Sequence, residues 1–196
     1  RRYSELRERD INLQVAIGAT EGEAEFHFIE NTGLSSLDKT IASSHTALGF
    51  QSILSKVEVT TLTNVCLQYC QNREIHFLKV DIEGYEKQAL SGNDWSCFRP
   101  WIVVVESTLP LSQIENHDEW EYILLEADYE FIYADGLNRF YVAKEHSELK
   151  VSFTYPPNVF DEFVLANQVF AESRASQAEQ SANESKIRAE IAEQNA

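Results

Sequence analysis

The sequence of 196 residues contains no methionine and only three cysteines. Cys66, Cys70 and Cys97 form neither a paired disulfide framework nor a CxxC motif. We therefore expect free thiols buried in the core, which is the usual state of cysteine in the cytosol, and a cytoplasmic location. Because the chain opens at Arg1 without a start methionine or a charged-then-apolar leader, we expect it to be a piece of a longer polypeptide.

Basic residues are also scarce. The sequence has 16 Lys and Arg against 32 Asp and Glu, which gives a formal net charge of -16. An acidic surface repels the phosphates of nucleic acids and anionic membranes, so neither partner is expected. The longest apolar runs have the length of strands, and no membrane span is predicted. The five histidines lack the spacing of a metal-binding pair.

Apolar residues are abundant enough for a folded core. Hydrophobic residues make up 43% of the chain and aromatic residues 11%, which favours a folded domain over disorder. The continuous apolar runs FLKV (77–80) and WIVVVE (101–106) predict strands covered on both faces, as in a parallel sheet. Residues 40–55 have a weak pattern and are interpreted as a loop with at most one helical turn.

The order of these patterns predicts an α/β fold. Strand patterns alternate with helical ones, and YEFIYADGLNRFYVAKE (129–145) predicts two strands around a DGLN turn. We expect residues 1–147 to form an open, mainly parallel sheet that ends in an antiparallel hairpin. The parallel part would need one or two strands ahead of Arg1, so the domain is expected to be incomplete.

The C-terminal part has a different composition. Residues 148–160 contain a Pro-Pro pair and predict a connector, and residues 161–196 are rich in Ala, Glu, Gln and Ser and predict a helix. Phe163, Ala166 and Phe170 begin a heptad-like seam that polar residues then interrupt. A solvated helix is therefore favoured over a stable coiled coil. Self-association, or contact with other domains, is the partner role that this tail suggests.

Acidic residues follow both continuous strands. Asp81 and Glu83 come after residues 77–80, and Glu106 ends the run 101–106. Ligands of open α/β sheets bind outside the carboxyl ends of the strands, and adjacent strands lie about 5 Å apart. We therefore expect the three carboxylates to converge on one crevice. The alternative is that Asp81 caps the next helix and Glu83 complements its dipole.

Two further residues of this segment have simple interpretations. Gly84 opens the predicted helix, where the absence of a side chain lets a ligand approach the backbone closely. Glu86 lies one turn into that helix, and a solvent-exposed position is the favoured interpretation.

The segment FLKVDIEGYEKQALSG (77–92) resembles the signature of the FkbM family of S-adenosylmethionine-dependent methyltransferases. That signature is an apolar strand, then Lys, a branched residue, Asp, an apolar residue, Glu, Gly, any residue and Glu. The segments VAIGATEGEAEFHF, NTGLSSL, VEVTTL and WIVVVEST also resemble the family, in the same order. The resemblance extends from residue 1 to about residue 163 and leaves out only the tail.

The resemblance implies a Rossmann-like class I methyltransferase fold with S-adenosylmethionine as cofactor. It further implies O-methylation of a hydroxyl on a sugar, a polysaccharide or a related metabolite. Cofactor contacts are expected from Asp81, Ala16 and Ile17. The family's glycine-rich loop and ribose-binding acid are absent from the sequence, and we expect both ahead of Arg1. The chain alone is then expected to be inactive.

Methyl transfer to an alcohol requires an oxygen aligned with the methyl group and gains from a base. Asp81 is the first candidate for this role, and Glu83 and Glu106 are candidates for the base or for orienting the acceptor. Asp81 and Glu106 could instead hold a divalent metal, but nothing in the sequence favours this, so no metal ligand is predicted.

Two functions of other classes remain open. The first is a non-catalytic α/β scaffolding module in a multidomain polysaccharide-modifying protein, held in place by its helical tail. The second is a nucleotide-sugar glycosyltransferase, which is disfavoured because its metal site needs a DxD spacing where this chain has DxE.

Overall fold

The computed structural model describes residues 5–30 and 32–194. The chain divides into two compact units, Arg1–Thr154 and Tyr155–Ala196. The strands of the described residues lie in the first unit, and the long C-terminal helix lies in the second.

The first sheet has three strands in the order β1-β3-β2. β1 (Ala16–Ile17) pairs in parallel with β3 (Ile53–Thr60), which pairs antiparallel with β2 (Gly22–Phe28). Phe26 is the register partner of Ser55, and Ala24 is that of Val57. Because side chains alternate between the two faces along a strand, these four residues share one face of the sheet.

Helix α2 (Lys39–Ala47) corrects the prediction of a loop over residues 40–55, since nine residues are helical and β3 begins at Ile53. Serine and threonine dilute its apolar pattern, so periodicity did not reveal it. The helix begins where it does because the Asp38 carboxylate accepts hydrogen bonds from the backbone N–H groups of Thr40 and Ile41.

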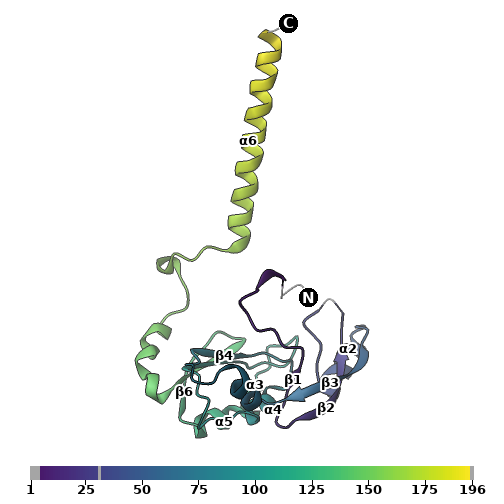
Figure 1. The fold of residues 1–196 in the computed structure, drawn as a ribbon, viewed down its shortest axis with the longest axis vertical. Coiled ribbons are helices and arrows are strands. Elements are labelled where there is room, and N and C mark those ends of the chain that lie inside the picture. The colour runs from purple at the N-terminus through teal and green to yellow at the C-terminus, as the bar shows by residue number, and fades with distance from the viewer. Residues whose placement is uncertain (1–4, 31, 195–196) are drawn as a thin grey trace. The chain divides into compact units, whose positions relative to one another are not determined.

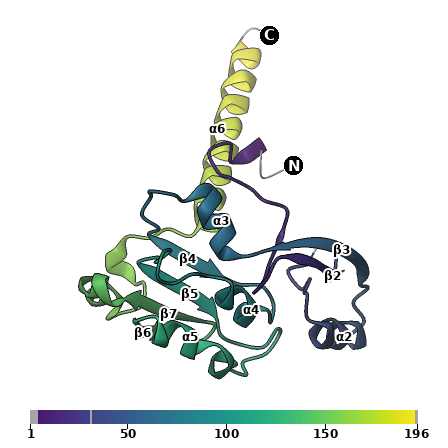
Figure 2. The ribbon, with the colours of Figure 1, turned by 60° about the horizontal axis from the view of Figure 1, so that its bottom comes forward.

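The second sheet has four strands in the order β4-β5-β7-β6 (Figure 2). These are β4 (Phe77–Val80), β5 (Ile102–Glu106), β6 (Tyr129–Ala134) and β7 (Asn138–Ala143). β4 and β5 are parallel, whereas β7 is antiparallel to both β5 and β6. The β6–β7 pair is the hairpin that the DGLN segment predicted.

The single, mainly parallel sheet predicted from the continuous runs is not confirmed. The described strands form two mixed sheets, with two parallel and three antiparallel pairings. The physical reason is that β1 pairs only with β3 and β4 only with β5 among the described residues, so the parallel pairs stay separate. Phe77 at the open edge of β4 is 66% exposed, contrary to a strand covered on both faces.

Helices α3 (Leu62–Tyr69), α4 (Glu86–Ser91) and α5 (Glu121–Glu126) each lie between two strands along the chain, in the alternating order that the sequence predicted. One core joins α4 and α5 to the second sheet, and Ile17 of β1 packs against it. The core residues are Val80, Ala89, Leu90, Val103, Val105, Trp120, Leu124, Tyr129, Tyr141 and Ala143. Short 3-10 segments lie at His117–Glu119, Lys144–Phe153 and Val159–Asp161.

The cysteines are free thiols, but the prediction that they lie in the core is wrong. Cys66 and Cys70 are half-buried at α3, and Cys97 is exposed. Burial raises the pKa of the Cys66 thiol to about 12, so it is a thiol rather than a thiolate at neutral pH.

The second unit contains α6 (Ala166–Gln194), an uninterrupted helix in Figure 1. All of its side chains from residue 166 to residue 188 are exposed. Across the part of the chain that the structure describes, no helix combines the length and the apolar character that crossing a membrane requires.

Candidate functional site

The turn that follows β4, residues 81–84, is called the acid turn below. Glu83 and Gly84 have positive φ angles of 54° and 91°. A residue with a side chain adopts this conformation at a cost of about 1 kcal/mol or more. A Cβ atom on Gly84 would lie 2.0 Å from Cδ1 of Ile41. Gly84 therefore accommodates the close approach of α2, rather than that of a ligand as the sequence had suggested.

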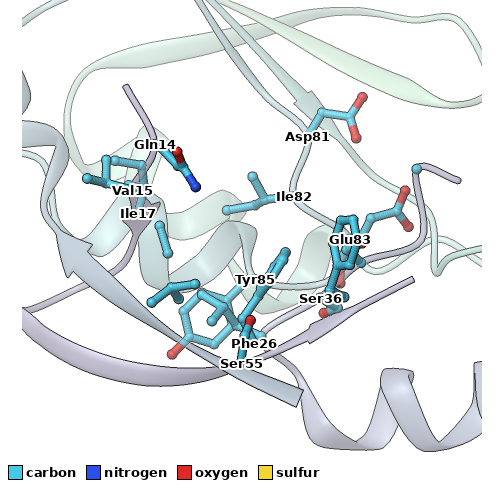
Figure 3. Close-up of a pocket in the computed structure, with 16 residues that line it drawn as sticks. Gln14, Val15, Ile17, Phe26, Ser36, Ser55, Asp81, Ile82, Glu83 and Tyr85 are labelled. Carbon is cyan, nitrogen blue, oxygen red and sulfur yellow. Dashed lines mark hydrogen bonds between the residues drawn. The ribbon is translucent and has the colours of Figure 1, made fainter. Parts of the chain in front are cut away.

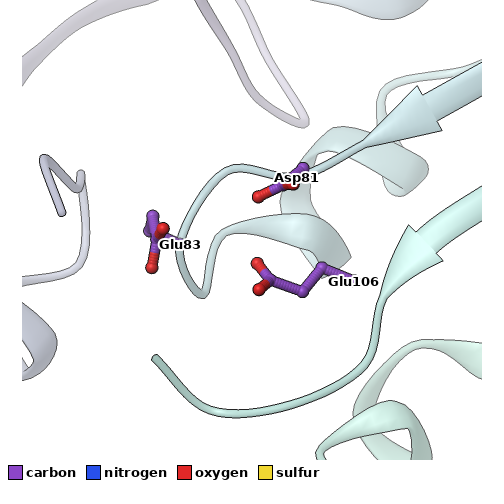
Figure 4. A group of neighbouring side chains, drawn as sticks. All are labelled: Asp81, Glu83 and Glu106. Atoms are coloured by element: carbon purple, nitrogen blue, oxygen red, sulfur yellow. The ribbon is translucent and has the colours of Figure 1, made fainter. Parts of the chain in front are cut away.

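The three predicted site carboxylates come together. Val80 and Val105 are register partners on parallel strands, so Asp81 and Glu106 are the next positions along neighbouring strands. Oxygens of Asp81, Glu83 and Glu106 lie within 4.8 Å of one another (Figure 4). The three carboxylates thus lie close together, whereas their sharing of one crevice and their chemical roles stay predictions.

Helix capping does not account for Asp81. The residue that caps α4 is Tyr85, and no side-chain hydrogen bond is made there. Asp81 instead lies 3.2 Å from the Lys79 ammonium group, with 45% of its side chain exposed. An ion pair this open to water contributes little to stability, so the Asp81 carboxylate remains available to a ligand.

The proximity of the carboxylates changes their protonation. Burial and a hydrogen bond with Asp81 raise the pKa of Glu106 to about 8. Burial and the charges of Asp81 and Glu86 raise the pKa of Glu83 as well. Glu106 therefore holds a proton at neutral pH, because a half-buried carboxyl group beside other carboxylates ionises less readily. This arrangement disfavours Glu106 as the base and leaves Asp81 as the better candidate.

Glu86 is buried, with 3% of its surface exposed, so the prediction of a solvated position is wrong. Its Oε1 atom accepts hydrogen bonds from the backbone N–H groups of Ile82 (3.2 Å) and Gly84 (3.1 Å). Burial raises the pKa of Glu86, although these hydrogen bonds oppose the shift. A glutamate in the first helical turn often bonds back to the preceding backbone, which is the signal that sequence reasoning missed.

A cavity of about 600 Å³ lies beside the acid turn and is lined by residues on or next to β1, β2 and β3 (Figure 3). Ala16 and Ile17, the predicted cofactor contacts, line it together with Asp81 and Glu83, whereas Glu106 does not. The rest of the lining is Gln14, Val15, Phe26, Phe28, Gly33, Ser35, Ser36, Leu37, Ser55, Val57, Ile82 and Tyr85. The cavity thus has a largely apolar wall and an acidic end.

The cavity fits one part of the cofactor that the resemblance implies. Its volume lies within the range of about 300–1,000 Å³ that is usual for small-molecule sites. The aromatic wall suits a flat purine ring, and the carboxylates suit a positive sulfonium. No Lys or Arg side chain lines the cavity in the described ranges, so the carboxylate of the cofactor has no basic partner there.

The three carboxylates could also be bridged by a divalent cation, because hard cations prefer oxygen ligands. Exposed acidic groups often have this spacing without an ion, and Asp81 is exposed. The cluster by itself therefore does not define a metal centre.

The fold and the site define an α/β domain with carboxylates at the ends of two neighbouring parallel strands, beside an apolar cavity. The methyltransferase FkbM domain family matches residues 2–131, well over half of the chain. The chain therefore belongs to this family, as its signature segment predicted. Residues after 131, including DGLNRFYV, lie outside the match. No curated protein and no solved structure matches the chain.

Proposed function

We propose that this chain is the catalytic part of an S-adenosylmethionine-dependent methyltransferase that methylates a hydroxyl group of a sugar, a polysaccharide or a related metabolite. Family membership supports methyl transfer. The observation that carries the proposal to this site is the convergence of Asp81, Glu83 and Glu106 at the ends of β4 and β5, next to the cavity.

In the proposed mechanism the residues of the chain align the acceptor and move one proton. The bound cofactor supplies a methyl group that is already activated. Asp81 accepts the proton of the acceptor hydroxyl, so that this proton ends on its carboxylate. Glu83 accepts a hydrogen bond from a second hydroxyl and orients the acceptor. Ala16 and Ile17, which line the same cavity, would contact the bound cofactor.

We also propose that the complete domain has one continuous Rossmann-like sheet. Among the described strands, β1 and β4 each pair on one side only, which leaves two open edges. An open edge presents unpaired N–H and C=O groups that further strands can satisfy. We propose that strands placed between these edges join the two sheets and bring the glycine-rich loop to the cavity.

Calorimetric titration of S-adenosylmethionine into the protein, as expressed from its gene, tests this function. The unmodified protein is expected to bind the cofactor. Asp81→Ala is expected to weaken binding about tenfold or more, because it removes a charged partner next to the sulfonium. Asp118→Ala is the matched control, since its carboxylate is 96% exposed and does not line the cavity. It should bind as the unmodified protein does.

Failure of the unmodified protein to bind the cofactor would remove the proposal and favour the non-catalytic scaffolding module. If it binds, transfer of a labelled methyl group to a panel of hydroxylated acceptors decides the reaction. Methyl transfer that survives Asp81→Ala at the full rate would remove Asp81 from its proposed role.

A further inference from the structure

The acid turn has a conformation that its own sequence does not favour. Positive φ angles at two successive residues, Glu83 and Gly84, are uncommon, and such turns persist only where the surroundings hold them. The direction of the Asp81 and Glu83 side chains depends on this turn, because both leave the backbone within it. Contacts that hold the turn therefore also hold the carboxylates.

One contact reaches the turn from α4, on its C-terminal side. Glu86 is almost fully buried, and its Oε1 atom alone accepts the hydrogen bonds from the N–H groups of Ile82 and Gly84. Both hydrogen bonds fix backbone units inside the turn. Because one oxygen makes both bonds, an uncharged side chain with the same oxygen could replace it.

The second contact reaches the turn from the loop after β2, far away in the sequence. Ser36 is 1% exposed, and its Oγ atom donates a hydrogen bond to the Glu83 carbonyl oxygen at 2.8 Å. The same Oγ accepts from the Asp38 N–H at 3.0 Å. The backbone of Ser36 exchanges two hydrogen bonds with His27 of β2, at 3.0 and 3.2 Å. Ser36 is thus rigidly placed and ties the first sheet to the acid turn.

We propose that Ser36 and Glu86 are positioning residues, which hold the acid turn from its two sides and thereby keep the carboxylates of Asp81 and Glu83 beside Glu106. Figure 3 shows Ser36 near Glu83, and Figure 4 shows the three carboxylates. Neither residue is proposed to touch the reacting atoms. This inference rests on the proposed function for its catalytic consequence, whereas the geometric part stands independently of it.

Four variants separate the contributions. Glu86→Ala removes the acceptor oxygen, whereas Glu86→Gln keeps an oxygen in the same place and removes only the charge. Ser36→Ala removes the hydroxyl that bonds to Glu83. Ser43→Ala is the matched control, because Ser43 is exposed and its hydroxyl bonds only to the Lys39 carbonyl of its own helix.

Two measurements read the position of the turn without any activity. The first is amide hydrogen exchange at Ile82 and Gly84, and the second is NMR titration of the Glu106 carboxyl. Glu86→Ala should accelerate exchange about tenfold or more, and Ser36→Ala, which removes no charge, should bring the Glu106 pKa back toward its ordinary value. Glu86→Gln should keep exchange within about threefold of the unmodified protein. Ser43→Ala should change neither quantity.

The third measurement is methyl transfer, in which kcat should fall for Glu86→Ala and Ser36→Ala and be largely retained by Glu86→Gln. Equal losses in Glu86→Gln and Glu86→Ala would overturn the proposal, because the charge would then matter and not the contact. Faster exchange with an unchanged Glu106 titration would overturn it too, since the contact would only stabilise the fold. If the unmodified protein neither binds cofactor nor transfers methyl groups, the proposed function fails, and the exchange and titration results still decide the positioning claim.

Discussion

At Gly84, a positive φ angle and a close contact with Ile41 coincide in one residue. Gly136 has nearly the same φ angle, 93° against 91°, but nothing within 4 Å of the place where a Cβ would stand. Substitution of Gly136 therefore measures the cost of backbone strain alone, and substitution of Gly84 measures strain together with steric overlap.

We predict that Gly84→Ala lowers the free energy of unfolding by about 3 kcal/mol, the sum of backbone strain and overpacking. Gly136→Ala should lower it by only about 1 kcal/mol, from strain alone. Urea denaturation of both variants measures the difference. Adding Ile41→Ala to Gly84→Ala should recover part of the loss, since it removes the overlapping methyl group. Equal losses at the two glycines would mean that α2 does not pack on the acid turn.

The residues of the site differ in how far the sequence could predict them. Asp81 and Glu106 could be placed together because the carboxyl ends of adjacent parallel strands share one edge. The bond of Glu86 back to the preceding backbone has a local signal in its place at the start of α4, whereas the burial of Ser36 depends on tertiary packing. Ser36 lies 47 positions away in the sequence from Glu83, its hydrogen-bond partner, and no local pattern reports such a contact.

Among the elements, β5 and β7 are joined by an ion pair beyond the sheet. Arg99, before β5, donates from Nε to Oε1 of Glu145 (2.6 Å) and from Nη2 to Oε2 (2.9 Å). This two-point contact lowers the pKa of Glu145 to about 2, mainly through the hydrogen bonds from Arg99. The pair ties the segment before β5 to the helix after β7.

We predict that this pair stabilises the fold above about pH 4.5 and loses its effect as the pH falls toward 2. The sign follows from a folded-state pKa of about 2 below the ordinary value of 4.5, because protonation then favours the unfolded chain. A double-mutant cycle with Arg99→Gln and Glu145→Gln should give a coupling of about 0.5–1 kcal/mol at pH 7, since Glu145 is partly exposed and screened. The coupling should vanish near pH 2. A coupling that is independent of pH would contradict the assigned ion pair.

Helices and strands with strong hydrophobic periodicity were predicted correctly. The predictions failed where a helix cap or the pairing of strands determines the structure. The hairpin of β6 and β7 followed from the two strand patterns around the DGLN turn. Helix α2 was not predicted, because it buries only Ala42 and His45 and its start depends on the Asp38 cap. The mixed pairing of the strands was not predicted, because an apolar run does not indicate which strands pair with it on either side.

At the scale of the whole molecule, the two units differ in how they are stabilised. The first unit has a continuous apolar core. α6 exposes its described side chains and is supported by contacts within the helix, such as Gln168 with Glu172 at 2.9 Å and Glu184 with Arg188 at 3.7 Å. Pairs four residues apart add only about 0.2–0.5 kcal/mol each, so length and helix-forming residues must contribute most of its stability.

We predict that a chain ending at Thr154 keeps the Tm of the full chain within about 2 °C, because the core lies entirely in the first unit. Circular dichroism should show the loss of helix without a loss of cooperative unfolding.

Polar residues Ser173, Gln177 and Gln180 interrupt the heptad-like seam, so sedimentation of the full chain should report a monomer. A dimer that disappears in the shortened chain would show that the exposed apolar residues near Phe163 and Phe170 form a self-association surface, and that the interrupted seam is not decisive.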